Sequence, residues 1–313
     1  IKSIKSLDLI YQDNDNLKNQ ISILKKNNSY ELKGSNLNAT KIIDDLLKNE
    51  TETKEGKIFD DNFKIDILID RVYLDKENKV NNFKGYVLLK NNKVIEANLV
   101  SQFTKKHKIK FTINSTSKEK ITTLYTDIAK PFVNRYEFIK GFEEGNLDFY
   151  SIKNNNISRS KLIIDNFKIQ EIPVLAKLLT LASLQGIADL LTGEGIRFTD
   201  FEMKFSNENK LMKIEELYAI GPAISIMADG YIESNKLISL RGTLVPATTI
   251  NRTIASIPII GNILVGKKVG EGVFGVSFKI KGPPKDLKTS VNPVKTLTPR
   301  FITRTLEKIK KSN

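Results

Sequence analysis

The stretch Phe63-Lys-Ile-Asp-Ile-Leu-Ile-Asp70 alternates apolar and polar residues with a period of two. Phe63, Ile65, Ile67 and Ile69 fall on one side of an extended chain, because successive side chains of a β-strand point to opposite faces. The same alternation recurs in HKIKFTIN (107–114), AISIMADGYI (223–232) and VFGVSFKI (273–280). The chain is therefore predicted to be mainly β.

Short polar turns such as KKNNS, DKEN, KNN and NENK separate these runs. Strands joined by tight polar turns are typical of an antiparallel meander with one apolar and one hydrated face. Leaving a dozen apolar side chains in water would forgo roughly 20–30 kcal/mol, more than the ~5–15 kcal/mol that stabilises a domain. The apolar face must therefore be covered, either by a second sheet in a sandwich, which is the commoner solution, or by an apolar ligand in a trough.

Three short helices are expected. The first is an amphipathic segment over 39–48, and the second is an apolar helix over 173–192 that begins at Pro173 and is expected to break at Gly186. The third is a basic helix after Pro299. From these elements three regions are predicted: a β region over 1–155, a second β region over 156–292 and the C-terminal helix over 293–313.

The amino-acid composition limits the classes of function that the chain could have. The 313 residues contain 50 Lys and Arg against 36 Asp and Glu, a net charge of +14 that favours an anionic partner such as phospholipid head groups. The chain has no cysteine and one histidine, so no nucleophile–base pair and no metal-ligand spacing is evident, and neither a metal nor a cofactor is expected. Its lysines are dispersed and it has no tryptophan, which argues against nucleic-acid binding. We expect a protein that is not an enzyme.

The apolar, interrupted segment IASIPIIGNILVG (254–266) is too short to cross a bilayer. It is interpreted as a buried connector or, alternatively, as a tip that meets a membrane or a partner protein. The residues predicted for such a tip are Ile257, Ile259, Ile260, Ile263 and Leu264.

The region 155–305 resembles the C-terminal part of the AsmA-like envelope proteins of Gram-negative bacteria, of the YhdP type. The matching segments are EIPVLAKLLTLASLQGIADLLTGEGIRF (171–198), IEELYAIGPAISIMADGYI (214–232), LISLRGTLVPATTINRTIASIPIIGNILVG (237–266), GEGVFGVSFKIKGPPKDLKTSVNP (270–293) and LTPRF (297–301). The chain departs from the family at Arg300, where glycine is usual.

This resemblance implies a long curved antiparallel sheet that forms an open, taco-like apolar groove, in place of a sandwich. It also implies a periplasmic protein, anchored in the inner membrane through an N-terminal segment that this chain lacks, which moves phospholipid between the two membranes. The predicted groove residues are Ile65, Ile67, Ile109, Phe111, Ile224, Ile226, Phe274 and Phe278. The alternative is a structural or assembly factor for the outer membrane, which would act on a membrane surface or an outer-membrane protein through the tip.

Overall fold

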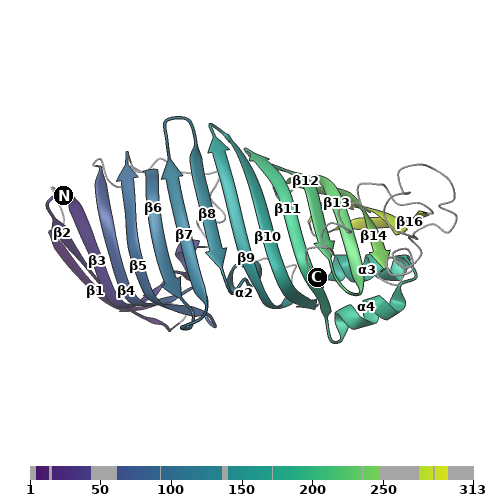
Figure 1. The fold of residues 1–313 in the computed structure, drawn as a ribbon, viewed down its shortest axis with the longest axis horizontal. Helices are drawn as coiled ribbons and strands as arrows, with labels where there is room; N and C mark the ends of the chain where they lie inside the picture. Colours follow the sequence, from purple (N-terminus) through teal and green to yellow (C-terminus); the bar gives the residue numbers. More distant parts are fainter. Residues whose placement is uncertain are drawn as a thin grey trace, which may run out of the picture. The chain divides into compact units, whose positions relative to one another are not determined.

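The computed structural model describes residues 5–13, 16–43, 62–91, 93–135, 140–170, 172–234, 236–246, 275–284 and 286–294. The described residues contain sixteen strands, which pair into one sheet in which the order of neighbours is the order of the sequence, from β1 to β16 (Figure 1). The predicted mainly β fold with a long sheet and few short helices is confirmed. The sandwich, which is the commoner way to cover an apolar face, is wrong for the described part of the chain because the strands there form one sheet.

The strands have the following bounds: β1 Ser6–Gln12, β2 Lys18–Lys26, β3 Ser29–Asn38, β4 Phe63–Tyr73, β5 Lys79–Lys90, β6 Lys93–Gln102, β7 Lys108–Ser115, β8 Lys120–Thr126, β9 Lys140–Asn154, β10 Ile157–Gln170, β11 Ile196–Glu208, β12 Leu211–Ile220, β13 Ile224–Glu233, β14 Leu237–Pro246, β15 Gly275–Gly282 and β16 Lys288–Val294. The helices are α2 Lys130–Val133, α3 Pro173–Leu181 and α4 Gln185–Thr192, and residues 40–43 are also helical.

Asparagine builds the tight turns. Asn27, Asn91, Asn155 and Asn209 lie between consecutive strands and have φ values of 50, 50, 52 and 54°. This left-handed conformation is the one that short hairpin turns need, and asparagine adopts it more readily than most residues. The abundance of asparagine in the polar segments therefore serves the strand reversals that the sequence predicts.

The chain divides into two compact units. The first contains residues 1–135 and 145–162, and the second contains 136–144 and 163–313. In the first unit, β3 and β4 pair in parallel, so the connection between them must return to the end of the sheet where β3 began. The other strand pairs described in this unit are antiparallel.

A small core lies where this connection leaves β3. Ile69, Val72, Leu74 and Val80 are buried together with Ala39, which immediately precedes the helical residues 40–43. Ile43 and Phe132 of α2 pack against the same cluster. Short helical segments thus cover one face of the first unit at the β4–β5 turn. A helix is predicted over 39–48, and residues 40–43 of this segment are helical. Residues 44–48 lie outside the described residues.

β-Bulges interrupt the ladders. The register shifts between Gln20 and Ile21, between Asn81 and Lys84, and between Leu88 and Leu89 in the first unit. In the second unit it shifts between Lys204 and Phe205 and between Ile214 and Leu217. A bulge bends its strand and increases the local twist. Each shift is therefore a place where its own strand is expected to bend.

In the second unit, the predicted apolar helix begins at Pro173 but forms two helices. The break lies at residues 182–184, where Ser183 has a φ of 59°, and not at Gly186, which falls in the first turn of α4. The two helices pack on each other, α3 contacts β16 and α4 contacts β11. Leu178, Leu179 and Leu191 are buried in these contacts, which explains why the segment is apolar on nearly all sides.

Another part of the core of the second unit is a cluster of aromatic rings. Phe167 stacks on Phe142 and on Phe198, with ring centroids 5.3 and 5.5 Å apart and interplanar angles of 19° in both pairs. All three rings are buried. Offset aromatic pairs at this separation add to the stabilisation that burial provides.

The C-terminal helix expected after Pro299 falls beyond β16, which runs to Val294, and residues 295–313 lie outside the described residues.

Glu144, at a left-handed position with φ of 62°, accepts two hydrogen bonds from Arg197 at 2.8 and 3.0 Å. This hydrogen-bonded guanidinium lowers the pKa of Glu144 below the usual 4.5. A carboxylate with a lowered folded-state pKa stabilises the fold at neutral pH, and this contribution disappears as the pH falls. We expect Glu144→Gln to lower the urea midpoint at pH 7 slightly, and this difference should shrink as the pH falls below 4.5 and through the lowered pKa of Glu144.

The matched control is Glu143→Gln, which removes an exposed neighbouring carboxylate that has no ion pair among the described residues. Its difference from the parent protein should not follow the same pH profile. A difference between Glu144→Gln and the parent that does not shrink as the pH falls below 4.5 would contradict the assignment.

Candidate functional site

One row of apolar residues crosses nine strands of the first unit. Each member is the direct register partner of the next, so all the side chains lie on the same face. The row consists of Leu7, Ile23, Leu32, Ile67, Gly85, Leu99, Phe111, Leu124 and Phe149. We call it the apolar row. With neighbouring strands about 4.8 Å apart, its eight steps span about 38 Å.

The apolar row is only half-buried along its whole length. The neighbouring row towards the helical segments is more protected, because Ile69 and Thr126 have no exposed surface and Leu147 is 5 % exposed. On the other side lie Ile65, Val87, Ala97 and Ile113, which are joined in the same manner. The face is therefore apolar over several rows, and its middle remains accessible in this unit.

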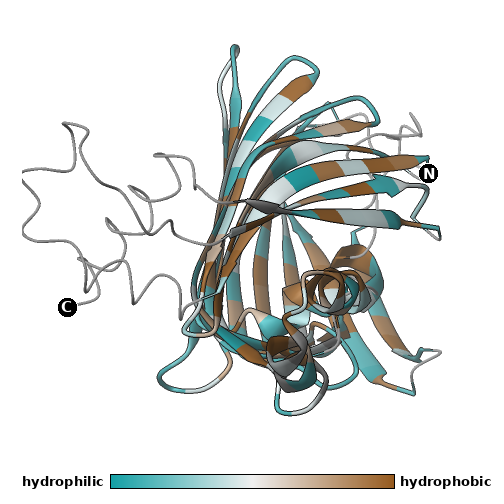
Figure 2. Ribbon diagram, turned by 90° about the vertical axis from the view of Figure 1, so that its right-hand side faces the viewer, coloured by the Kyte–Doolittle hydropathy of each residue, from teal (hydrophilic) through white to brown (hydrophobic). Residues whose placement is uncertain are grey.

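The opposite face has a different character. The register places a parallel row there, which we call the polar row: Asp8, Ser22, Lys33, Leu68, Lys84, Val100, Lys110, Tyr125 and Asp148. Most of its members are exposed charged or polar side chains. Brown and teal segments alternate along the strands in Figure 2, in keeping with the period of two in the sequence. One face of the first unit is thus suited to water and the other to hydrocarbon.

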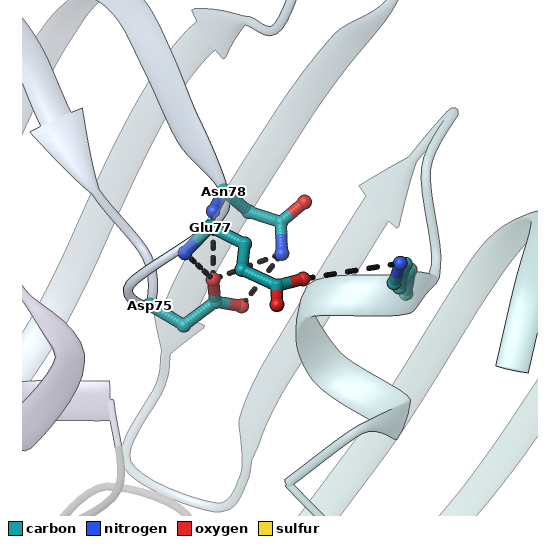
Figure 3. A network of polar contacts seen from close by, with 4 residues as sticks. Asp75, Glu77 and Asn78 are labelled. Carbon is teal, nitrogen blue, oxygen red and sulfur yellow. Dashed lines mark hydrogen bonds and ion pairs between the residues drawn. The ribbon is translucent and has the colours of Figure 1, made fainter. Parts of the chain in front are cut away.

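A polar network holds the helical segments at the edge of the apolar face. Asp75, in the β4–β5 turn, accepts hydrogen bonds from the backbone N–H groups of Glu77 and Asn78 at 2.8 and 2.7 Å and from the side-chain amide of Asn78 (Figure 3). Glu77 lies 3.9 Å from the ammonium group of Lys130 in α2. The turn is therefore tied to the helix that packs on the buried core.

Arg135 extends this network. Its guanidinium donates to the carbonyl oxygens of Pro131 at 3.0 Å and Thr40 at 3.3 Å, and also to that of Leu74. One side chain thus joins α2, the start of the helical residues 40–43 and the end of β4. A planar group with five N–H donors is well suited to such bridging. The consequence is a fixed boundary at one end of the apolar face.

The predicted groove residues of the first unit share the accessible face. Ile67 and Phe111 belong to the apolar row, Ile65 lies in the row on one side, and Ile109 lies in the row on the other side, against the buried core. All four are half-buried. Other members of the row, such as Leu32, Leu99 and Phe149, were missed by the sequence reasoning, because strand register, which alternation does not encode, brings them together.

The predicted groove residues of the second unit are in a more enclosed setting. Ile224 and Phe278 are 0 % and 5 % exposed, and Ile226 is half-buried. Ile226 and Phe278 share one face, since Ala228, two residues after Ile226, is the register partner of Gly242, which in turn pairs with Phe278. Phe274 and the predicted tip residues Ile257, Ile259, Ile260, Ile263 and Leu264 lie outside the described residues.

A shallow depression of about 300 Å³ lies in the second unit over β13 to β16. Its charged residues are Asp229, Arg241 and Lys279, and Asp229 accepts a hydrogen bond from Arg241 at 3.0 Å. Arg241 and Asp229 have 74 % and 45 % of their side chains exposed. Met227, Ala228 and Phe278 also line the depression, which is therefore open and of mixed polarity.

Within the described ranges, no group of three or more His, Asp or Glu residues could hold a metal ion. His107 lies in the exposed turn between β6 and β7, with Nδ1 3.1 Å from the hydroxyl of Thr104. Among the described helices, none is both long and apolar enough to span a bilayer.

Gly85 sits at the centre of the apolar row with a φ of +144°, and a β-carbon there would lie 1.9 Å from the carbonyl oxygen of Asn98. Gly85→Ala should therefore lower the free energy of unfolding by about 1–3 kcal/mol. Gly186→Ala is the matched control, because Gly186 lies in a helix and a β-carbon there would have no atom within 4 Å. This second change should stabilise by about 0.5–1 kcal/mol. Urea denaturation measures both, and effects of the same sign would contradict the argument.

The chain matches no known protein-family model, no curated protein and no solved structure.

Proposed function

We propose that this chain is a non-enzymatic phospholipid carrier of the AsmA-like type, which moves lipid between the inner and outer membranes in the periplasm of a Gram-negative bacterium. The observation that carries the proposal is the half-buried apolar row across β1 to β9. A surface of this kind rarely remains exposed to water in a soluble protein unless it binds something apolar.

The dimensions suit acyl chains. A bilayer's hydrocarbon core is about 30 Å thick and contains two leaflets, so one acyl chain extends roughly 15 Å. The apolar row is about 38 Å long and could accommodate hydrocarbon from more than one lipid. Each methylene moved from water to this face contributes about 0.8 kcal/mol. Because the contact is non-directional, a lipid can shift from strand to strand without breaking specific bonds, which suits transport better than storage.

Lipid transport is preferred to the assembly role because the described residues include the apolar row but not the tip. The assembly role depends on the tip around 257–264, which lies outside the described residues. The apolar row, in contrast, is directly defined by strand register. The resemblance of region 155–305 to the AsmA-like family supports the same choice.

Native mass spectrometry of the gently purified chain tests the proposal. We expect bound phospholipid in the spectrum and transfer of fluorescent phospholipid between donor and acceptor vesicles in the presence of the protein. Vesicles alone provide the background rate of transfer. If no phospholipid is retained and the protein does not raise the transfer rate, the proposed function is wrong.

A further inference from the structure

Strands β14 to β16 of the second unit carry an excess of positive charge on one face. Strand register places Arg241 of β14 directly opposite Lys279 of β15. It also places Lys281 of β15 directly opposite Lys288 of β16. Because alternate residues of a strand share a face, Lys279 and Lys281 lie on the same side of the sheet, about 7 Å apart. We call these four residues the cationic cluster.

The cationic cluster is open to solvent. Lys279, Lys281 and Lys288 are exposed, and the side chain of Arg241 is 74 % exposed. Arg241 forms an ion pair with Asp229 at 3.0 Å, whereas the three lysines form none with the described residues. Most of the positive charge on this face is therefore neither covered nor neutralised by the described part of the chain, and an incoming anion can reach it.

The cationic cluster does not contribute to the packing of the sheet. Phe278 and Ile280 alternate with the lysines of β15, lie on the opposite face and are 5 % and 6 % exposed. Like charges on directly opposite residues of neighbouring strands are destabilising. Folding alone therefore does not account for four cations at these positions, whereas binding to an anionic partner would.

The concentration of one sign of charge distinguishes this surface from the polar row of the first unit. The polar row contains Lys33, Lys84 and Lys110. It also contains Asp8 and Asp148, so charges of both signs are spread across it. The lysine-rich composition of the chain thus produces a mixed surface in one place and a cationic one in the other.

Uncharged polar side chains adjoin the cationic cluster. The shallow depression over β13 to β16 is lined by Thr243, Ser290 and Asn292 as well as by Arg241 and Lys279. Ser290 and Asn292 are exposed. Hydroxyl and amide groups donate hydrogen bonds, which phosphate oxygens accept. Because the depression is open, it presents these groups on a surface and does not enclose a single ligand.

Tyr231 lies on the same face as the cationic cluster, because it pairs with Ser239, which in turn pairs with Lys281. Its surface is 38 % exposed. Tyrosine has an apolar ring and a polar hydroxyl, and it is enriched at membrane interfaces, where one end is apolar and the other is wet. The face therefore combines cations, hydrogen-bond donors and an amphipathic ring.

We propose that the cationic cluster is a docking surface for an anionic lipid bilayer. A bilayer presents phosphate groups side by side, which suits cations spread over three strands on an open surface, and clustered Lys and Arg residues are attracted to such membranes. An acidic protein would normally bury aromatic or apolar anchors in enclosed pockets, which this open depression does not provide. The inference goes beyond lipid carriage, because it assigns a membrane contact to the second unit and does not depend on the apolar row.

The test is sedimentation of the purified chain with vesicles of phosphatidylcholine, with or without phosphatidylglycerol. The test variant is Lys279→Gln/Lys281→Gln/Lys288→Gln. Each lysine near an anionic bilayer contributes about fivefold to the affinity. We therefore expect the parent chain to bind phosphatidylglycerol vesicles about a hundredfold more tightly than phosphatidylcholine vesicles at low salt, and less selectively at high salt. The test variant should lose most of this preference.

The matched control is Lys84→Gln/Lys105→Gln/Lys110→Gln. It removes three exposed lysines of the first unit and changes the net charge by the same amount, so it should keep the preference of the parent. Arginine in place of the three lysines of the cationic cluster retains the charge and should also keep the preference. Circular dichroism and thermal melting show whether each variant is folded.

Equal binding of the parent to both kinds of vesicle would overturn the docking surface. A control variant that loses as much affinity as the test variant would also overturn it, because net charge alone would then explain the effect. So would polyglutamate that binds the parent as tightly as phosphatidylglycerol vesicles, which would indicate an acidic protein partner, or inorganic phosphate that displaces the vesicles at millimolar concentration, which would indicate a site for a single anion. Native mass spectrometry should find bound phospholipid in the test variant as in the parent, and its absence from both would overturn the proposed function alone.

Discussion

If the chain carries phospholipid as proposed, replacing Ile67 and Phe111 together with aspartate should strip the lipid from the protein while the sheet stays folded. Both residues lie in the apolar row, where Ile67 is the register partner of Gly85 and Phe111 is the register partner of Leu99. Each large apolar side chain that contacts hydrocarbon contributes roughly 1.5–3 kcal/mol. Loss of two such contacts should weaken lipid binding by about a hundredfold or more, since 1.4 kcal/mol corresponds to a factor of ten.

The control is a pair of aspartates on the other side of the same strands. Leu68 in β4 and Lys110 in β7 belong to the polar row and are exposed, with Leu68 at 48 %. Leu68→Asp/Lys110→Asp introduces the same side chains one residue away and should retain lipid. Native mass spectrometry measures occupancy and circular dichroism measures folding.

If the aspartate variant of the apolar row unfolds, Ile67→Gln/Phe111→Gln tests the same surface without adding charge. It should also lose lipid, to a smaller extent. Retention of phospholipid by a folded variant of either kind, at the level of the polar-face control, would show that the apolar row does not contact lipid.

Ile69→Ala should cause a large loss of stability in the first unit. Ile69 has no exposed surface and packs with Val72, Leu74 and Val80 beneath the helical segments. Removing buried methyl and methylene groups loses their transfer free energy and leaves a cavity, which together cost about 2–5 kcal/mol. Urea denaturation monitored by circular dichroism measures the change.

Leu68→Ala is the matched control for this truncation, because Leu68 is the preceding residue and points to the hydrated face. Its effect should stay within about 0.5 kcal/mol. The pair of variants separates burial from position along the chain. Equal effects at residues 68 and 69 would mean that the two faces of β4 do not differ in burial.

Alternation predicted much of the fold because it is a local property. Residues 63–70 lie in β4 and residues 108–113 lie in β7. In both strands, alternate residues lie on the same face, as the period of two predicts. Pro173 begins a helix as expected because its fixed φ and missing N–H suit the first helical position. Asparagine-rich segments form turns for the equally local reason that asparagine tolerates a positive φ.

Features that depend on distant residues were beyond such reasoning. Period two is the same in a sandwich and in a single sheet, so the number of sheets could not be read from it. The enclosure of Ile224 and Phe278 depends on parts of the chain far from them in sequence. The parallel pairing of β3 with β4 depends on the connection between them, which alternation does not encode. The helix break lies at Ser183, before Gly186, where the sequence predicts it.

The strictly sequential order of the strands bears on how each unit assembles. A strand added to the end of the order pairs only with the strand synthesised just before it, so most ladders close short loops; the longest exceptions are the connections from β3 to β4, from β10 to β11 and from β14 to β15. Chains with mainly nearest-neighbour interfaces behave approximately as one-dimensional arrays, in which folding nucleates locally and propagates. Folding of each unit could therefore begin during synthesis, and shortening a unit from its outer edge by whole hairpins should leave the remaining ladders intact.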